Sequence, residues 1–289
     1  VTPYERPHVD YRPYAEPAAR RQVDRRRRLG ARLGHEDIEH PYTAHLLELT
    51  GPPAPDVVLL GNLHGGFFDL RRVPDLAARV PVVLRLADSW AFTGHCAIPG
   101  RCDGWARGCG RCPDLDRPPA IRRDATRRNL RVKAEVWRRS SLSVVAPSRW
   151  LLDRACRSAL APAIRTAAVV PNGVDLGVFR PGGERAAAAA LGVEEGVAVL
   201  ATVSNLGLAN ATKDGATLLG AAAALERRVA LVALGGGTAR RERIGLVDVV
   251  HLPRTSERAA VAALLRAADV YVHAAPEESF CLAAAEALA

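Results

Sequence analysis

Short apolar runs alternate with longer amphipathic segments along the chain from residue 56 onward. Short apolar runs between turn residues are typical of buried strands, and apolar positions at helical spacing are typical of helices. Helices are expected at residues 75–79, after Ser148 as N-cap, and at 214–228, 256–268 and 280–289. Strands are expected at residues 56–60, 81–86, 142–146, 167–170, 197–203, 229–234, 247–252 and 269–274.

This alternation predicts an α/β fold of parallel sheets covered by helices. It stops at residues 177–184, a Pro- and Gly-containing stretch that is expected to be a linker, and then restarts. We therefore predict a polar, Arg-rich lead-in at 1–50, a first Rossmann-like domain at 51–176 and a second at 184–289. Doubly wound domains of this kind bind ligands in a crevice at the carboxyl ends of their strands.

Charge favours anionic partners, because 40 basic against 31 acidic residues give a net charge of +9. Nucleotide phosphates, nucleic acid and an anionic membrane surface all fit. Aromatic residues make up only 5% of the chain, which argues against a nucleic-acid platform built on base stacking. The run Arg25 to Arg28 is interpreted as a solvated helix face rather than a phosphate or membrane patch. Lys133 and Lys213 are the only lysines, so each is a candidate for a role that arginine does not serve.

No stretch approaches the ~18 apolar residues of a membrane span, and no secretory leader is visible. A cytoplasmic location is expected, and peripheral contact with the inner membrane face stays open as a second possibility. Cysteines in a reducing compartment are expected to be free or metal-bound rather than paired in disulfides.

Four of the six cysteines, Cys96, Cys102, Cys109 and Cys112, lie in a Gly-rich loop at 94–113. The last two form a Cys-x-x-Cys knuckle of the kind that wraps tetrahedral zinc. Zinc held by four thiolates would have no open position, so it would be structural rather than catalytic. The alternative is a loop with free thiols or redox-sensitive pairs.

Two carboxylates and one lysine are candidates for ligand binding near the C-terminal end. Glu278 and Glu286 are separated by seven residues, which places them on nearly the same side of a helix, where both could accept hydrogen bonds from sugar hydroxyls. Lys213 at a helix start and the triplet Gly235, Gly236 and Gly237 after a strand could cradle a phosphate. The alternatives are ordinary surface carboxylates, a solvated lysine and a plain loop.

In their order and spacing, several segments resemble the retaining, nucleotide-sugar-dependent glycosyltransferases of family 4 (group 1), of the polysaccharide-biosynthesis type. That family has the GT-B fold of two facing Rossmann-like domains. The resemblance rests on the segments 62–66 (Asn-Leu-His-Gly-Gly), 88–96, 94–113, 146–151, 170–175, 213–215 and 267–270, and on the Glu278/Glu286 pair.

The resemblance implies transfer of a sugar from a nucleotide-sugar donor to a glycan or lipid-linked acceptor, with no catalytic metal. Lys213 would neutralise the donor diphosphate, Glu278 would contact the sugar and Glu286 would bind the ribose hydroxyls. The resemblance also implies that the turn Gly235 to Gly237 would approach the nucleotide and that Asn172 and Gly173 would border the cleft. The residues that would face the acceptor are Asn62, His64 and Asp88.

The chain departs from the family pattern at several positions. Ala87 stands where many relatives have His, Asp214 intervenes between Lys213 and Gly215, and no arginine precedes Lys213 within 204–212. No opening strand is recognised, and the chain stops at Ala289, so both Rossmann-like halves are expected to be incomplete. Two alternatives therefore stay open: a catalytically inactive glycosyltransferase fragment, and a Cys-rich basic nucleic-acid-binding protein.

Overall fold

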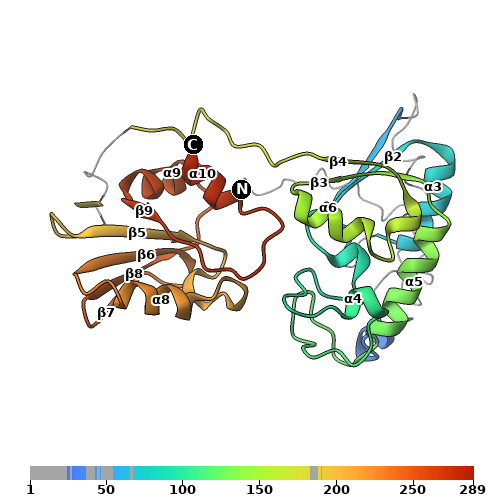
Figure 1. Cartoon of the computed structure of the whole chain (residues 1–289), viewed down its shortest axis with the longest axis horizontal. Coiled ribbons are helices and arrows are strands. Elements are labelled where there is room, and N and C mark those ends of the chain that lie inside the picture. The colour runs from blue at the N-terminus through green and yellow to red at the C-terminus, as the bar shows by residue number, and fades with distance from the viewer. Residues whose placement is uncertain are drawn as a thin grey trace. The chain divides into compact units, whose positions relative to one another are not determined.

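The computed structural model describes residues 25–26, 28–36, 43, 46, 55–65, 68–182, 188–189 and 191–289. The chain forms two compact units, an N-terminal one that extends to Pro171 and a C-terminal one from Asn172 to Ala289. Each contains its own sheet with covering helices, which confirms the predicted α/β class (Figure 1). The boundary lies between Pro171 and Asn172, before the linker expected at 177–184.

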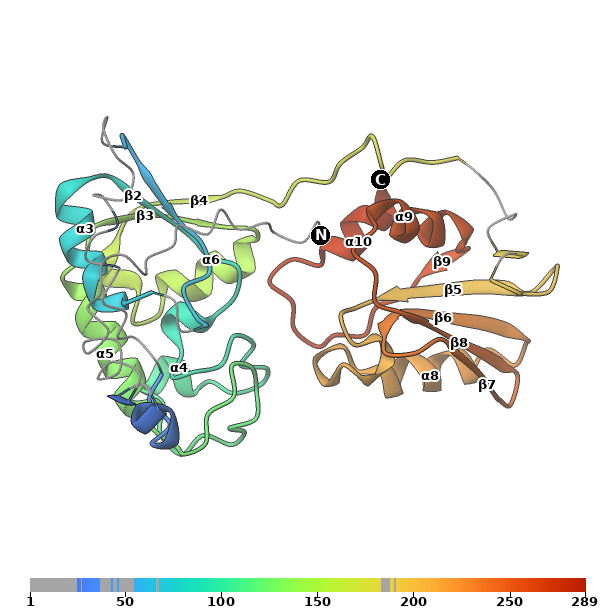
Figure 2. The ribbon, with the colours of Figure 1, turned by 180° about the vertical axis from the view of Figure 1, so that it is seen from behind.

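The N-terminal unit is built on a four-stranded parallel sheet in the order β1-β2-β3-β4. Its strands follow one another in chain order, and right-handed crossovers then place successive helices on one face. Figures 1 and 2 show α5 and α6 together on one side of the strands. The elements are β1 (Val58–Leu60), α3 (Val73–Arg79), β2 (Val82–Arg85), α4 (Gly104–Arg107), α5 (Thr126–Arg138), β3 (Leu142–Ala146), α6 (Arg149–Cys156) and β4 (Ile164–Val169).

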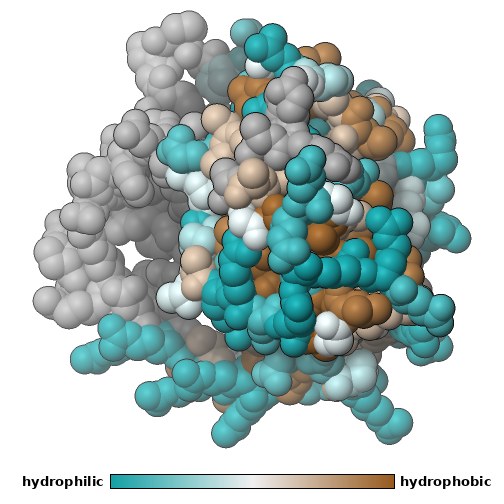
Figure 3. All heavy atoms as spheres, turned by 90° about the vertical axis from the view of Figure 1, so that its left-hand side faces the viewer, coloured by the Kyte–Doolittle hydropathy of each residue, from teal (hydrophilic) through white to brown (hydrophobic). Residues whose placement is uncertain are grey.

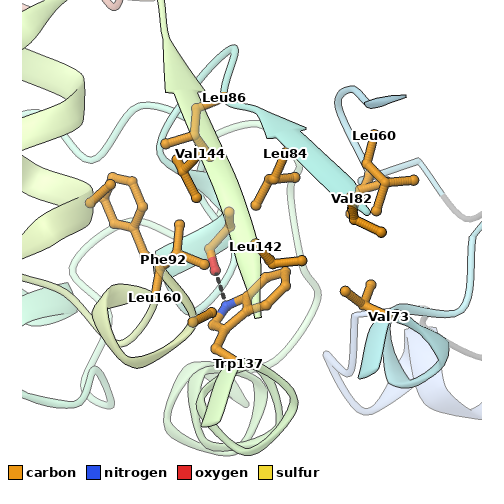
Figure 4. Packing of buried hydrophobic residues seen from close by; sticks show 14 of the residues in the cluster. Leu60, Val73, Val82, Leu84, Leu86, Phe92, Trp137, Leu142, Val144 and Leu160 are labelled. Atoms are coloured by element: carbon orange, nitrogen blue, oxygen red, sulfur yellow. Dashed lines mark hydrogen bonds between the residues drawn. The ribbon is translucent and has the colours of Figure 1, made fainter. Parts of the chain in front are cut away.

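The core of this unit lies between the sheet and its helices (Figure 4). Alternate residues of β3, including Leu142 and Val144, are buried against Trp137 of α5. The Trp137 indole is fully buried, and its Nε1 donates to the carbonyl of Ala91 at 2.8 Å. Burial of this large ring therefore leaves no polar atom of the indole unsatisfied.

Helix α5 was not predicted from the sequence. Six of its positions are buried and recur at helical spacing, but three of them are polar: Thr126, Asn129 and Lys133 beside Leu130, Val136 and Trp137. The Lys133 ammonium lies 2.5 Å from the carboxylate of Glu36 and donates to two backbone carbonyls. The lead-in around Glu36 is thereby docked on the N-terminal unit.

The C-terminal unit has a five-stranded sheet in the order β7-β8-β6-β5-β9, parallel except for β7. Across the sheet, the four parallel strands β8, β6, β5 and β9 are the third, second, first and fourth parallel strands of the chain. This order is the Rossmann arrangement. Helix α8 covers one face, and α9 and α10 cover the other (Figure 1). The elements are β5 (Ala198–Val203), α8 (Gly215–Ala223), β6 (Val229–Gly236), β7 (Arg240–Ile244), β8 (Val247–Pro253), α9 (Arg258–Ala267), β9 (Val270–Tyr271) and α10 (Leu282–Leu288).

The central strand β6 is buried on both sides, as expected for a doubly wound sheet. Leu231 packs in the cluster that contains Leu218 of α8. Val232, one residue later, packs in the cluster that contains Leu264 of α9. Successive side chains of a strand point to opposite faces, so β6 contributes to both cores.

Some predicted boundaries were wrong. Helix α8 ends at Ala223 rather than at 228, before Glu226, whose φ of 50° is incompatible with a right-handed helix. Strand β9 is shorter than expected, and α10 begins at Leu282 rather than at 280. The edge strand β7 was missed because all five of its residues are exposed and three are arginines. Figure 3 views the molecule from the side on which β7 lies and shows hydrophilic side chains projecting from this face.

Candidate functional site

A cavity of about 400 Å³ lies at the carboxyl ends of the parallel strands of the C-terminal unit. The order of the strands reverses between β5 and β9, and parallel sheets bind ligands at such a switch point. The lining includes residues that follow all four parallel strands: Ser204 and Asn205 after β5, Gly235 at the end of β6, Arg254 after β8 and His273 after β9.

Lys213 and Glu278 form an ion pair in this cavity. Their side chains are 24% and 20% exposed, so the pair is largely withdrawn from water. Burial lowers the pKa of Lys213, and the thiol of Cys281 opposes this effect. The amine and the carboxylate therefore face the space that a ligand would fill.

His273 stands beside this pair. Its Nε2 is buried without a hydrogen bond and lies 3.4 Å from the Glu278 carboxylate. Burial lowers the pKa of His273, and the nearby Lys213 lowers it further. The imidazole is thus held neutral near pH 7 with one ring nitrogen available to a ligand.

Glu286 of α10 lines the same cavity as Glu278, but Glu278 precedes α10 and does not share a helix face with Glu286 as expected. Burial raises the pKa of Glu286, and Arg258 opposes this rise. Arg254 and Arg258 also line the cavity, and neither was identified from the sequence. No local motif marks them, because only the packing of α9 against the sheet brings them to the strand ends.

Gly235 is the only member of the glycine triplet that reaches the cavity. Its φ is +118°, and a Cβ there would lie 1.4 Å from the carbonyl oxygen of Ser204. Only glycine therefore allows the end of β6 to meet the loop after β5. Gly236 and Gly237 lie outside the lining, as do Asn172 and Gly173 at the start of the C-terminal unit.

The presence of Asp214 between Lys213 and Gly215 is explained by the start of helix α8. Asp214 is the N-cap of α8, with a φ of 50°, and its carboxylate accepts from the Thr217 amide at 3.2 Å. A Cβ on Gly215 would lie 2.3 Å from the carbonyl oxygen of Leu208. Lys213 consequently precedes a capped helix that packs closely on the preceding turn.

The candidate acceptor residues of the N-terminal unit lie together at the ends of β1 and β2. The Asp88 carboxylate is 3.1 Å from both Asn62 Nδ2 and His64 Nε2. Its other oxygen accepts from the Trp90 amide at 2.8 Å. Asp88 thereby fixes the positions of Asn62 and His64 at one edge of the sheet.

Cys96, Cys102, Cys109 and Cys112 line one cavity of about 520 Å³ in the N-terminal unit, together with His95. All four thiols are free. Among the described residues, three candidate metal ligands come within 4.8 Å of one another only at His273, Glu278 and Cys281. Within the residues that the structure describes, no helix has the length and apolar character needed to cross a membrane.

The chain is similar in sequence to glycosyltransferases. It is 26% identical over 155 residues to WcaC of Escherichia coli, named as a colanic acid biosynthesis glycosyl transferase. It is 38% identical over 134 residues to the D-inositol 3-phosphate glycosyltransferase of Segniliparus rotundus. These matches cover 50% and 42% of this chain, but only 38% and 29% of those relatives. No family model matches the sequence.

The fold is that of a solved glycosyltransferase structure. Sucrose-phosphate synthase from Thermosynechococcus elongatus superposes with a TM-score of 0.54 at 14% identity, over 86% of this chain and 57% of the synthase. At this identity the likeness shows the fold. The chain is therefore similar in sequence to glycosyltransferases, and its fold is the GT-B fold expected from the resemblance to group 1 (family 4).

Proposed function

We propose that the chain binds a nucleotide-sugar donor in the cavity of its C-terminal unit and acts in a retaining glycosyl transfer to a glycan or lipid-linked acceptor. The observation that carries this proposal is the Lys213–Glu278 pair in a cavity at the switch point of a Rossmann-like sheet. The names of the sequence relatives support glycosyl transfer as the reaction class.

The charges around the cavity suit a nucleoside diphosphate. Lys213, Arg254 and Arg258 are cations, and a diphosphate that leaves the sugar gains negative charge as the bond breaks. Cations held in place before the reaction stabilise that charge without reorganisation. The neutral His273 adds a buried nitrogen beside Lys213 that could donate to a phosphate or sugar oxygen.

The two carboxylates would orient the donor. Glu278 lies against Lys213, and this contact supports a role at the junction of sugar and diphosphate, where Glu278 would accept from sugar hydroxyls. Glu286 lies further along α10 and would accept from the ribose hydroxyls. Asn62, His64 and Asp88 would bind the acceptor, with Asp88 orienting the His64 imidazole.

Calorimetric titration of the chain with nucleoside diphosphates and their sugar conjugates tests the proposal. We expect one base to bind, and we expect Lys213→Ala to abolish that binding. Arg240→Ala, which removes an exposed cation on β7, is the matched control and should leave the affinity unchanged. A folded chain that binds no nucleotide, or that binds equally after Lys213→Ala, would refute the donor site.

Transfer is tested separately, with the bound donor and glycan or lipid-linked acceptors. The anomeric configuration of the product, read by NMR, decides between retention and inversion. Donor binding without transfer by this chain would instead support the alternative of an inactive fragment.

A further inference from the structure

The cysteine-lined cavity of the N-terminal unit has no part in the proposed transfer. It lies in the loop between β2 and α5, and its lining includes none of Asn62, His64 and Asp88. Its lining brings together four thiols and the ring of His95, which is only 1% exposed.

We infer that this cavity binds one tetrahedral Zn²⁺ ion through the Cys109–Cys112 knuckle, with the two remaining ligands drawn from Cys96, Cys102 and His95. Thiolate and imidazole are the ligands that zinc prefers in structural sites. The inference does not depend on the proposed glycosyl transfer.

The backbone of the knuckle is held in an unfavourable conformation. Four consecutive residues, 108–111, have positive φ angles, and two of them, Cys109 (55°) and Arg111 (56°), are not glycine. A left-handed conformation is unfavourable for a residue with a Cβ atom. Such strain persists where the surroundings enforce it, and it is frequent where a chain wraps a ligand.

Contacts from the start of α5 hold this turn in place. The Thr126 hydroxyl accepts from the Gly110 amide at 2.9 Å, and the Asp124 carboxylate accepts from the Cys112 amide at 2.7 Å. The two amides are thus satisfied by side chains, while the thiols of the knuckle line the cavity. These contacts hold the backbone of the knuckle in its positive-φ conformation.

His95 has the arrangement of a metal-binding histidine. Its Nδ1 lies 2.9 Å from the carbonyl oxygen of Pro119, and because a carbonyl can only accept, the ring donates its Nδ1–H to this oxygen. The lone pair is thereby placed on Nε2, which lies 3.4 Å from the Cys112 sulfur. A histidine ligand usually donates its other N–H to a carbonyl or carboxylate in this way.

Zinc binding would draw the thiols together. No three of these sulfurs lie as close to one another as the ligand atoms of His273, Glu278 and Cys281, which are all within 4.8 Å of each other. Each coordinating thiol would release its proton to solvent and form a Zn–S bond, and zinc would keep its +2 charge. Gly100, Gly108 and Gly110, all at positive φ, leave the loop able to make this adjustment. At the His273 group, by contrast, the Glu278 carboxylate is already paired with Lys213.

Metal analysis of the purified chain tests the inference. The chain is loaded with one equivalent of zinc and dialysed, and we expect about one zinc per chain. Cys109→Ser and Cys112→Ser should each reduce the content at least tenfold. Cys156→Ser, at an exposed thiol on α6, and His273→Ala, at the competing group, should retain it.

Cobalt titration of the unmodified chain keeps the test independent of whether the variants fold. We expect thiolate-to-cobalt charge-transfer absorption that saturates at one equivalent, and protection of the four loop cysteines from alkylation while Cys156 reacts. A wild-type chain that retains no zinc and shows no such absorption overturns the inference. Zinc that survives Cys112→Ser, or that is lost only in His273→Ala, also overturns it.

Discussion

Lys213 and Glu278 lie 65 residues apart in the sequence and contact each other in the cavity of the C-terminal unit. The Glu278 carboxylate contacts the same amine that we assign to the donor diphosphate. A diphosphate must therefore compete with Glu278 for Lys213, whereas a complete donor also presents a sugar to Glu278.

Glu278→Gln is expected to affect the two ligands in opposite directions. The bare nucleoside diphosphate should bind several-fold more tightly, because Lys213 is released and one like charge is removed, a change of about 1 kcal/mol. Transfer from the nucleotide-sugar should fall by at least tenfold. Calorimetry and a transfer assay measure the two effects, and equal weakening of both ligands would contradict this role of Glu278.

Arg258→Ala is expected to weaken nucleoside diphosphate binding about tenfold, the effect of losing one charge-assisted hydrogen bond. Arg258 also lies 3.2 Å from the Asp175 carboxylate and over the Phe179 ring, so it has a structural contact as well. A thermal unfolding scan separates the two roles. Lower stability with unchanged affinity, compared with Arg240→Ala, would show that Arg258 only secures the segment around Asp175.

Gly235→Ala is expected to lower the free energy of unfolding by about 2 kcal/mol or more, because a Cβ at this positive φ meets the Ser204 carbonyl. Gly237→Ala is the matched control, since nothing lies within 4 Å of a Cβ at that position. Urea denaturation measures both. If Gly235→Ala were as stable as Gly237→Ala, the loop after β5 would have to move away from the added Cβ at little cost in free energy.

Lys133→Met is expected to destabilise the chain by about 3–5 kcal/mol, because it leaves the Glu36 carboxylate buried without its cation. The double variant Glu36→Gln/Lys133→Met should recover much of that loss. Arg131→Met, at an exposed position of the same helix, should change stability by less than about 0.5 kcal/mol. Urea denaturation of these proteins and of the Glu36→Gln single variant checks the series, and additive single effects would disprove the coupling.

Glu286 should make stability depend on pH. Burial raises its pKa in the folded chain above the value of 4.5, so the folded state binds a proton more readily than the unfolded state. Its contribution is fully favourable below about pH 4.5 and is lost as pH rises through the raised value. Glu286→Gln should therefore remove part of this slope between pH 4.5 and 7, by less than about 1 kcal/mol because the group is partly solvated. Glu195→Gln, at an exposed carboxylate, should keep the wild-type slope.

Much of the local structure could be predicted. Strand β3 has the predicted bounds, and the Ser148 hydroxyl caps α6 by accepting from the Leu151 amide at 3.3 Å. Both features depend on neighbours within a few residues, where periodicity and side-chain chemistry are sufficient. Helix α5 escaped prediction because Lys133 interrupts its apolar stripe, and β7 because an exposed edge strand needs no apolar run.

The sequence by itself determined the fold class and the members of the cavity that carry recognisable spacing, Lys213, Glu278 and Glu286. Only the tertiary structure decided that Arg254, Arg258 and His273 join them, and that Gly236, Gly237, Asn172 and Gly173 do not. The reason is physical: spacing along the chain reports which side chains share a helix face or a strand end. The order in which strands pair decides which loops meet, and that order arises from packing across the whole sheet.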